Sequence, residues 1–275
     1  MALDENTRIS SVQAQIRDCA SRGDYSGAET CLLRALRSAE LRKSDHLFLW
    51  NELGMVYKYL GKFRKSRQLY RRTLRQTPRY LKGADRDFFL AALYHNLGGL
   101  EHARGHFRRG ERFARKGLQL RQRVTSSRSL PVAVDMAALA AILDGQKKFD
   151  ESERLYRRAL AVFRREYGPS HGETAILFSN LAALCQATGR SKTSMEYYRR
   201  ALKMKRQMFG STHPSVALTL NNLGMLYGAQ GDTRQAERCL RAALRILQPF
   251  GPRHFQYKDV KRNYQLVSES LSRVA

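Results

Sequence analysis

The chain repeats itself with a period of about 42 residues, and this register limits the folds open to it. Residues 221–244 (NNLGMLYGAQGDTRQAERCLRAAL) align with residues 179–202 (SNLAALCQATGRSKTSMEYYRRAL) after a shift of 42. A copy at 51–74 follows after a shift of 44, and a weaker copy at 15–36 after a shift of 38. One apolar position recurs through four copies: Leu97, Leu139, Leu181 and Leu223. Self-similarity at a period of this length predicts a stack of repeated units.

Each unit contains two apolar patterns at helical spacing, separated by a glycine or a polar turn. In the last unit the turn is marked by Gly231, and Gly224 and Ala236 are small enough to let the two helices approach closely. The core residues expected of these two helices are Leu220, Leu223, Met225, Tyr227, Leu240, Ala243 and Leu244.

This spacing predicts six helix-turn-helix units in a single array over residues 1–253, followed by a capping helix at 254–275. The predicted units cover residues 9–46, 47–90, 91–132, 133–174, 175–216 and 217–253. The capping helix, drawn at about 256–273, should close the stack with one apolar face made of Val260, Tyr264, Val267, Leu271 and Val274.

The pattern L-G-x-x-Y, then G, then A-x-x-x-(L/Y)-x-x-A-L resembles the tetratricopeptide repeat. With HPSVALTLNNLGMLYGAQGDTRQAE at 213–237, it is similar to the 42-residue variety of kinesin light chains and nephrocystin-type proteins. The resemblance covers roughly residues 8–250. The first copy departs most, with Gln15 where leucine is expected, as terminal units often do. No long heptad segment is present for pairing with a motor heavy chain, so motor association is not carried over.

The resemblance implies an all-α, right-handed α-solenoid of about six repeats. It also implies a non-catalytic interaction scaffold or adaptor, which holds a peptide or helix of another protein in a concave groove lined by the first helices. We therefore expect a protein partner, with an acidic segment as one option, no enzyme activity and no cofactor. The oligomeric state is left open.

Composition agrees with a folded chain that does not insert into a membrane. Hydrophobic residues make up 43% of it, yet no stretch reaches the ~18 apolar residues of a membrane span. The start, MALDENTRISSVQAQIRD, lacks the apolar region of a secretory signal, so we expect a cytoplasmic location. Four cysteines at packing positions form neither a disulfide framework nor a zinc motif: Cys19, Cys31, Cys185 and Cys239.

Three histidines raise the question of a metal or catalytic triad. His171, His213 and His254 follow YG, FG and FG at equivalent repeat positions, so one ion cannot reach all three. The alternative is a repeated turn, in which glycine ends one helix and a histidine precedes the start of the next. We favour the turn, and we interpret His95, His102 and His106 as solvated or partner-facing.

The net charge is +26, and the basic residues concentrate on the second helices. They should form an outer ladder of Arg71, Arg72, Arg115, Lys116, Arg157, Arg158, Arg199, Arg200 and Arg241. The alternative function is therefore binding of RNA, DNA or another anionic surface through this convex face. Nucleic-acid binding would be weak and nonspecific, and a compositional bias toward arginine is the plain alternative.

The first helices are much less charged, since residues 215–230 and 174–188 contain no charged residue. The candidate groove residues are Asn51, Lys58, His95, Asn96, His102, Asn180, Asn221, Asn222 and Met225. The resemblance implies that the asparagine amides bond to the backbone of a bound peptide. Hydrogen bonding between helices inside the stack is the other reading.

Overall fold

The computed structural model describes residues 11–19, 23–38, 41–168, 172–250 and 255–272, and every regular element in these ranges is helical. Together with the helix pairing, this confirms the predicted all-α solenoid class. The chain forms two compact units, residues 1–147 and 148–275, which are described separately. From the second predicted unit onward, each first helix starts three to eight residues before its unit, because the prediction set the unit boundaries from the apolar pattern rather than from the preceding turn.

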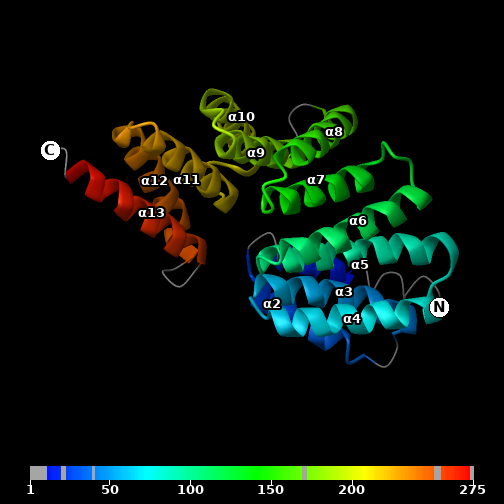
Figure 1. Ribbon diagram of the computed structural model, residues 1–275. Helices are drawn as coiled ribbons and strands as arrows, with labels where there is room; N and C mark the ends of the chain where they lie inside the picture. The colour runs from blue at the N-terminus through cyan, green and yellow to red at the C-terminus, as the bar shows by residue number, and fades with distance from the viewer. Residues whose placement is uncertain (1–10, 20–22, 39–40, 169–171, 251–254, 273–275) are drawn as a thin grey trace. The chain divides into compact units, whose positions relative to one another are not determined.

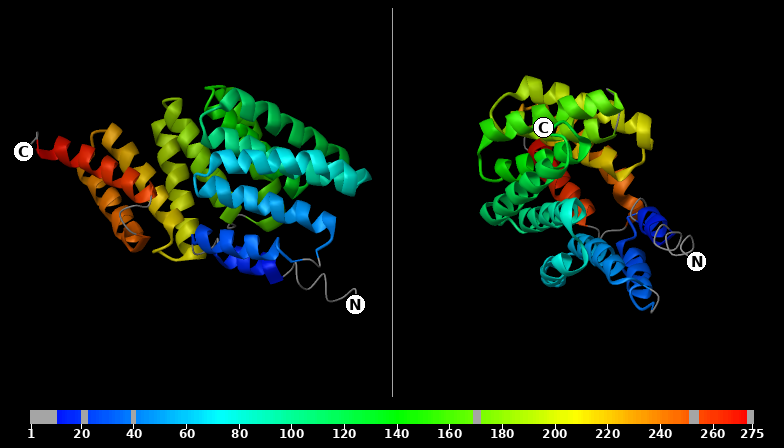
Figure 2. Two further views of the ribbon diagram at one scale, coloured as in Figure 1. Left: turned by 90° about the horizontal axis from the view of Figure 1, so that it is seen from below. Right: turned by 90° about the vertical axis from the view of Figure 1, so that its right-hand side faces the viewer.

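In the N-terminal unit, residues 11–19 are helical and precede the remaining helices, which pack against their sequence neighbours (Figures 1 and 2). These are α2 (Tyr25–Ala35), α3 (Lys43–Tyr59), α4 (Phe63–Tyr80), α5 (Gly83–Ala103), α6 (Phe107–Val124) and α7 (Leu130–Asp144). The pairs α3–α4 and α5–α6 are the predicted helix-turn-helix units. Close approach within the first pair depends on Gly54, where an added Cβ would lie 2.5 Å from the ring of Tyr70.

The C-terminal unit repeats this arrangement. Its helices are α8 (Phe149–Tyr167), α9 (Gly172–Ala187), α10 (Ser191–Phe209), α11 (Pro214–Ala229), α12 (Thr233–Leu247) and α13 (Phe255–Ser272), with a short 3₁₀ turn at Gln248–Phe250. In both units, a serine hydroxyl on a second helix donates a hydrogen bond to the first helix of its pair. The Oγ of Ser66 donates to the carbonyl of Gly54 at 2.7 Å, and the Oγ of Ser194 donates to that of Ala182 at 2.8 Å.

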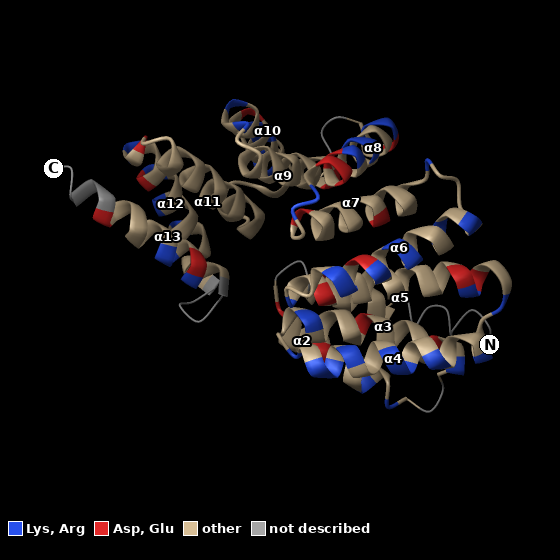
Figure 3. Ribbon diagram, viewed as in Figure 1, with Lys and Arg blue, Asp and Glu red and all other residues tan. Residues whose placement is uncertain are grey.

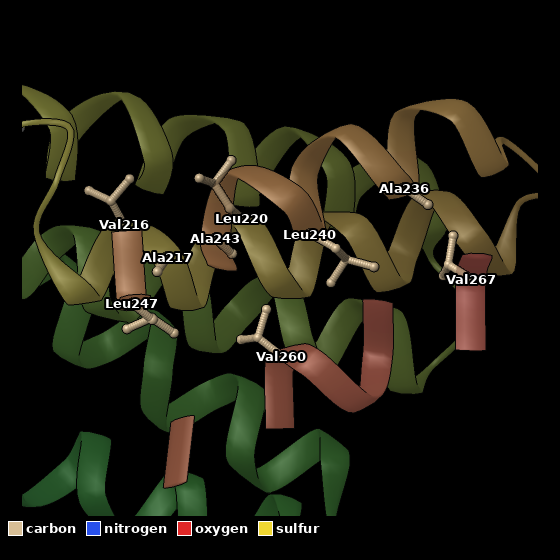
Figure 4. Packing of buried hydrophobic residues seen from close by; sticks show 9 residues of the cluster. All are labelled: Val216, Ala217, Leu220, Ala236, Leu240, Ala243, Leu247, Val260 and Val267. Carbon is tan, nitrogen blue, oxygen red and sulfur yellow. The ribbon is translucent and has the colours of Figure 1, made fainter. Parts of the chain in front are cut away.

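The predicted capping helix is α13, and it packs on α12 and α11. Val260 and Val267 are buried against the core residues of those helices (Figure 4). Tyr264 packs beside them. The apolar face is therefore confirmed for these three residues. The side chain of Leu271 and the whole of Val274 lie outside the described residues.

The turn interpretation of the histidine motif is confirmed where the structure describes it. Gly210 ends α10 with a φ of 80°, which is a conformation that glycine adopts without strain. His213 is the N-cap of α11, since its Nδ1 accepts a hydrogen bond from the backbone N–H of Ser215, and Pro214 is the first helical residue. His171 and His254 lie outside the described residues.

Candidate interaction surface

A row of solvent-facing apolar residues runs along the first helices at one repeat position. In the N-terminal unit it consists of Phe48, Ala92 and Val134, and in the C-terminal unit of Ile176 and Leu218. Ala92 is half-buried, but the exposed fractions of the others are 42%, 40%, 46% and 37%. A single exposed leucine or valine is ordinary on a protein surface. An exposed apolar residue at the same place in successive repeats is the signature of a contact surface.

The asparagine row lies one helical turn further along the same helices. Asn96, Asn180 and Asn222 follow Ala92, Ile176 and Leu218 by four residues, so they share their helix face. All three are half-buried. The surface therefore places amide groups beside apolar side chains, which is the chemistry needed to hold a peptide by both its backbone and its side chains.

Several of these amides are already bonded between helices. The Nδ2 of Asn96 donates to the Oδ1 of Asn51 at 2.8 Å, joining α5 to α3. In the C-terminal unit, Asn263 of α13 donates to Asn221 at 2.9 Å, and Asn221 donates to Asn222 at 3.2 Å. The inter-helix reading thus holds for Asn51, Asn96 and Asn221, whereas the bond from Asn221 to Asn222 lies within α11. Because a side-chain amide has two donor and two acceptor positions, capacity remains for a ligand.

A pocket of about 200 Å³ opens on the first-helix face of the N-terminal unit, between α5, α6 and α7. Most of its exposed wall is apolar, although four of its eight lining residues are polar or charged. The lining residues are Phe88, Ala92, His95, Asn96, Arg121, Pro131, Val134 and Asp135. Two of the predicted groove residues, His95 and Asn96, are thus brought together with two members of the apolar row, Ala92 and Val134.

A buried ion pair forms part of this pocket. The Nε of Arg121 donates to Oδ2 of Asp135 at 3.1 Å, and its Nη1 donates to the carbonyl of Phe88 at 3.1 Å. His95 Nδ1 lies 2.8 Å from the other carboxylate oxygen of Asp135. Both members of the pair are buried, with side-chain exposed fractions of 7% and 4%. The cation is neutralised within the protein, so this pocket favours an uncharged apolar group.

The remaining groove candidates are half-buried and separate from the pocket. Burial lowers the pKa of Lys58, and burial together with the charge of Lys58 lowers the pKa of His102. Lys58 also lies over the ring of Tyr59, with its Nζ 4.6 Å from the ring centroid. Asn180 and Met225 are half-buried on α9 and α11. Among the predicted groove residues, Lys58 is therefore the one Lys or Arg.

The three histidines of the third repeat do not gather into one site. His95 contacts Asp135, and His102 packs edge-on against the ring of Phe107. His106 is the N-cap residue of α6, and its Nδ1 lies 3.0 Å from the buried carboxylate of Glu101. Over the part of the chain that the structure describes, no group of three or more His, Cys, Asp or Glu side chains is arranged to hold a metal ion.

The nine residues of the predicted outer ladder are all exposed on the second helices. Their charge is partly neutralised by glutamates one helical turn earlier, at 2.8 Å for Glu111–Arg115 and 2.7 Å for Glu153–Arg157. Arg241 pairs with Glu237 in the same way. Two other members lie over aromatic rings of the preceding first helix, namely Arg72 over Trp50 and Lys116 over Tyr94.

The ladder is uneven along the chain (Figure 3). The charged residues of α4 are all basic: Arg64, Lys65, Arg67, Arg71, Arg72, Arg75 and Arg79. Helix α6 carries seven basic residues and one glutamate, whereas α8 carries five basic and four acidic residues. Helix α10 carries six basic residues and one glutamate, so positive charge is highest on α4 and α6, with α10 close behind, and lowest of the four on α8.

The sequence reasoning missed the exposed apolar row. The first helices are apolar on most sides, so helical periodicity cannot separate a core-facing residue from a solvent-facing one. The available signal was the register itself. Phe48, Ala92, Val134, Ile176 and Leu218 keep one apolar position that is distinct from the core position of Leu97 and its equivalents.

Stacked helix pairs with small residues at their crossings define a helical-repeat protein. Tetratricopeptide repeat models match residues 49–80, 90–128, 132–207 and 193–248. The chain belongs to the tetratricopeptide repeat family. By its fold it is a protein-interaction scaffold, and the repeat is typical of non-catalytic proteins. No sequence among curated proteins matches the chain.

Solved structures show the same fold at low sequence identity. BtubC (BKLC) from P. vanneervenii is 23% identical, with a TM-score of 0.61 over 90% of this chain and 93% of that one. A putative kinesin light chain with nearly identical TPR-like repeats from Podosopora anserina is 17% identical, with a TM-score of 0.57 over 77% and 100%. The signal transduction ATPase with a tetratricopeptide repeat sensor from Pyrococcus horikoshii is 14% identical, with a TM-score of 0.65 over 95% and 36%.

Among the described residues, no helix combines the length and the apolar character needed to cross a membrane.

Proposed function

We propose that the first-helix face of each unit binds a segment of a partner protein, as a non-catalytic adaptor that needs no cofactor. The observation that carries this proposal is the row of exposed apolar residues at one repeat position, with asparagine amides one turn away. The pocket beside Val134 has room for one apolar side chain of the bound segment. The four cysteines are free thiols, which supports a reducing compartment such as the cytoplasm.

The proposal predicts that a charge placed in the apolar row abolishes binding and leaves the fold intact. Random peptides displayed on phage would be selected on the wild-type chain, and the selected peptides would then be tested on Val134→Asp and Ile176→Asp. We expect each substitution to weaken binding of peptides that occupy its unit by at least about 30-fold, or about 2 kcal/mol, since an aspartate would lie unpaired against an apolar ligand. Both positions are exposed, so helical circular dichroism and melting should change little.

The matched control is Leu33→Asp, because Leu33 has a similar exposed fraction of 37% but lies on α2, outside the row. Its peptide binding should equal that of the wild type. Equal binding by all three variants, or a selection that yields no peptide sequence, would contradict a groove function.

A second candidate function is polyanion binding through α4 and α6, and the observation that favours it is the wholly basic charge of α4. Binding of a single-stranded RNA should then fall steeply as salt rises from ~50 to ~200 mM. Arg71→Gln with Arg72→Gln should weaken it severalfold and flatten the salt dependence, whereas Arg157→Gln with Arg158→Gln on the nearly balanced α8 should do so far less. A shallow salt dependence in the wild type would exclude this function.

A further inference from the structure

Two equivalent triads of side chains lie between successive repeats. The first consists of Arg121, Asp135 and His95, and the second, two repeats later in the sequence, of Lys205, Thr219 and Ser179. In both, a long cation from a second helix bonds to a residue of the next first helix, Arg121 to Asp135 and Lys205 to Thr219. Lys205 also bonds directly to Ser179 on the preceding first helix, whereas His95 joins the first triad through Asp135. The triads therefore occupy the same place in the N-terminal and the C-terminal unit.

The two triads differ in charge balance. Asp135 neutralises Arg121, but the partners of Lys205 among the described residues are two hydroxyls, the Oγ of Ser179 at 3.0 Å and the Oγ1 of Thr219 at 2.9 Å. Lys205 is nevertheless buried, with an exposed fraction of 6%. Within the described residues no carboxylate forms an ion pair with it. Burying a cation without an anion costs desolvation free energy. A negative charge from another molecule would therefore be favourable beside Lys205.

The two hydrogen bonds of the Lys205 ammonium leave one of its N–H groups unused. Both hydroxyls donate their own protons to carbonyls of the preceding turn, Ser179 to Ala175 and Thr219 to Ser215, each at 3.1 Å. Lys205 therefore donates to their oxygen atoms, and these two bonds use two of its three N–H groups. The third N–H and the whole positive charge are left for a ligand.

This ammonium lies next to the exposed first-helix face. Ser179 follows the exposed Ile176 by three residues on α9, so the two share that face. The equivalent residue of the N-terminal unit is His95, which lines the open pocket. A serine in place of an imidazole leaves a smaller side chain beside the cation.

We propose that Lys205, Ser179 and Thr219 form an anion subsite on the first-helix face of the C-terminal unit, and that its ligand is a carboxylate of the bound protein segment. The carboxylate is either an Asp or Glu side chain or a chain terminus. It supplies from the partner what Asp135 supplies internally in the N-terminal unit. The N-terminal pocket then takes an apolar group and the C-terminal subsite an acid. This inference rests on the proposed groove function.

The test uses the full chain and phage-displayed random peptides. Peptides selected on the wild type should carry Asp or Glu at one fixed position, and changing that residue to Asn or Gln should weaken binding by at least about 30-fold. Peptides whose acid is the chain terminus should lose the same factor when synthesised as C-terminal amides. These two arms identify the source of the carboxylate.

Two variants assign the acid preference to this subsite. Lys205→Met removes the cation, and Thr219→Asp supplies the internal acid found in the other triad; both should abolish the preference for an acidic peptide over its amide counterpart. Lys203→Met is the matched control, because it removes an exposed cation from the same helix, and it should retain the preference.

The outcomes separate this inference from the proposed function. Selected peptides that depend on Ile176 but show no acid preference would overturn the anion subsite and leave groove binding intact. An acid preference that survives in Thr219→Asp would overturn it as well. Loss of all dependence on Val134 and Ile176 would instead overturn the groove function.

Discussion

Replacing Asp135 with asparagine should lower the free energy of unfolding of the N-terminal unit by about 3–5 kcal/mol. The reason is that Arg121 stays buried, and its guanidinium loses the carboxylate that neutralises it at 3.1 Å. The contact between His95 and the carboxylate is weakened by the same change. The chain's single tryptophan, Trp50, lies on α3 of this unit, so its fluorescence during urea denaturation reports the change.

A double variant distinguishes a lost charge pair from a general packing defect. One repeat later, the positions of Arg121 and Asp135 are occupied by Phe163 and Leu177, which are both buried. Arg121→Phe with Asp135→Leu recreates that apolar pair and should recover most of the lost stability, since buried ion pairs can often be replaced by apolar residues without net cost.

Asp85→Asn is the control, because Asp85 is exposed in the first turn of α5, and it should cost less than about 1 kcal/mol. A loss of similar size in Asp85→Asn and Asp135→Asn would show that the buried pair is not the cause.

The fold could be predicted from the sequence because its main determinants recur in register. Small residues such as Gly224 and Ala236 and the buried leucines of the first helices return once per repeat. Turn glycines such as Gly231 recur too, except in the fourth repeat, where Lys147 takes the position with a φ of 61°. The one-sided pattern of Val260 and Val267 placed the capping helix within a residue of α13. Each of these signals is local or has a fixed period, so no knowledge of distant contacts was needed.

The candidate site was less accessible to sequence reasoning. Arg121 and Lys205 looked like further members of a basic, solvated helix, although the residues at the same repeat position, Phe163 and Leu247, are buried. A charged residue at an apolar repeat position was therefore a usable signal. Asp135 faces Arg121, whereas Thr219 faces Lys205. This difference depends on contacts between repeats, which the apolar pattern does not encode.

Replacing Lys205 with methionine should stabilise the C-terminal unit at neutral pH, although the substitution removes two hydrogen bonds. Burial lowers the pKa of Lys205 from 10.5 to about 8, which corresponds to an electrostatic cost of about 3 kcal/mol for the charged form. Methionine keeps the length of the side chain without the charge. Ser179 and Thr219 still donate to backbone carbonyls, so neither hydroxyl proton is left unbonded. Hydrogen exchange of amides in α9 to α11 measures the gain within this unit.

The lowered pKa of Lys205 also fixes how the stability difference between the wild type and Lys205→Met changes with pH. Because the folded pKa lies below that of the unfolded chain, the unfolded state binds more protons between about pH 8 and 10.5. The stability of the wild type relative to Lys205→Met should therefore rise with pH across this window, and the full cost of the charge is present below it. His213 faces Lys205, and its pKa is lowered below 6.5, so it titrates outside the window. The raised thiol pKa values of Cys185 and Cys239 are common to both proteins and cancel in the difference.

Lys203→Met again serves as the control, because Lys203 is exposed on the same helix, and its stability should stay within about 0.5 kcal/mol of the wild type at every pH. A less stable Lys205→Met at pH 7, or a difference from the wild type that does not change between pH 7 and 10.5, would mean that the buried ammonium is already compensated inside the protein. In that case an external carboxylate would have no charge left to neutralise. A stabilised variant would instead show that the C-terminal unit gives up stability to keep a cation beneath its binding face, which is the condition that makes an acidic ligand favourable there.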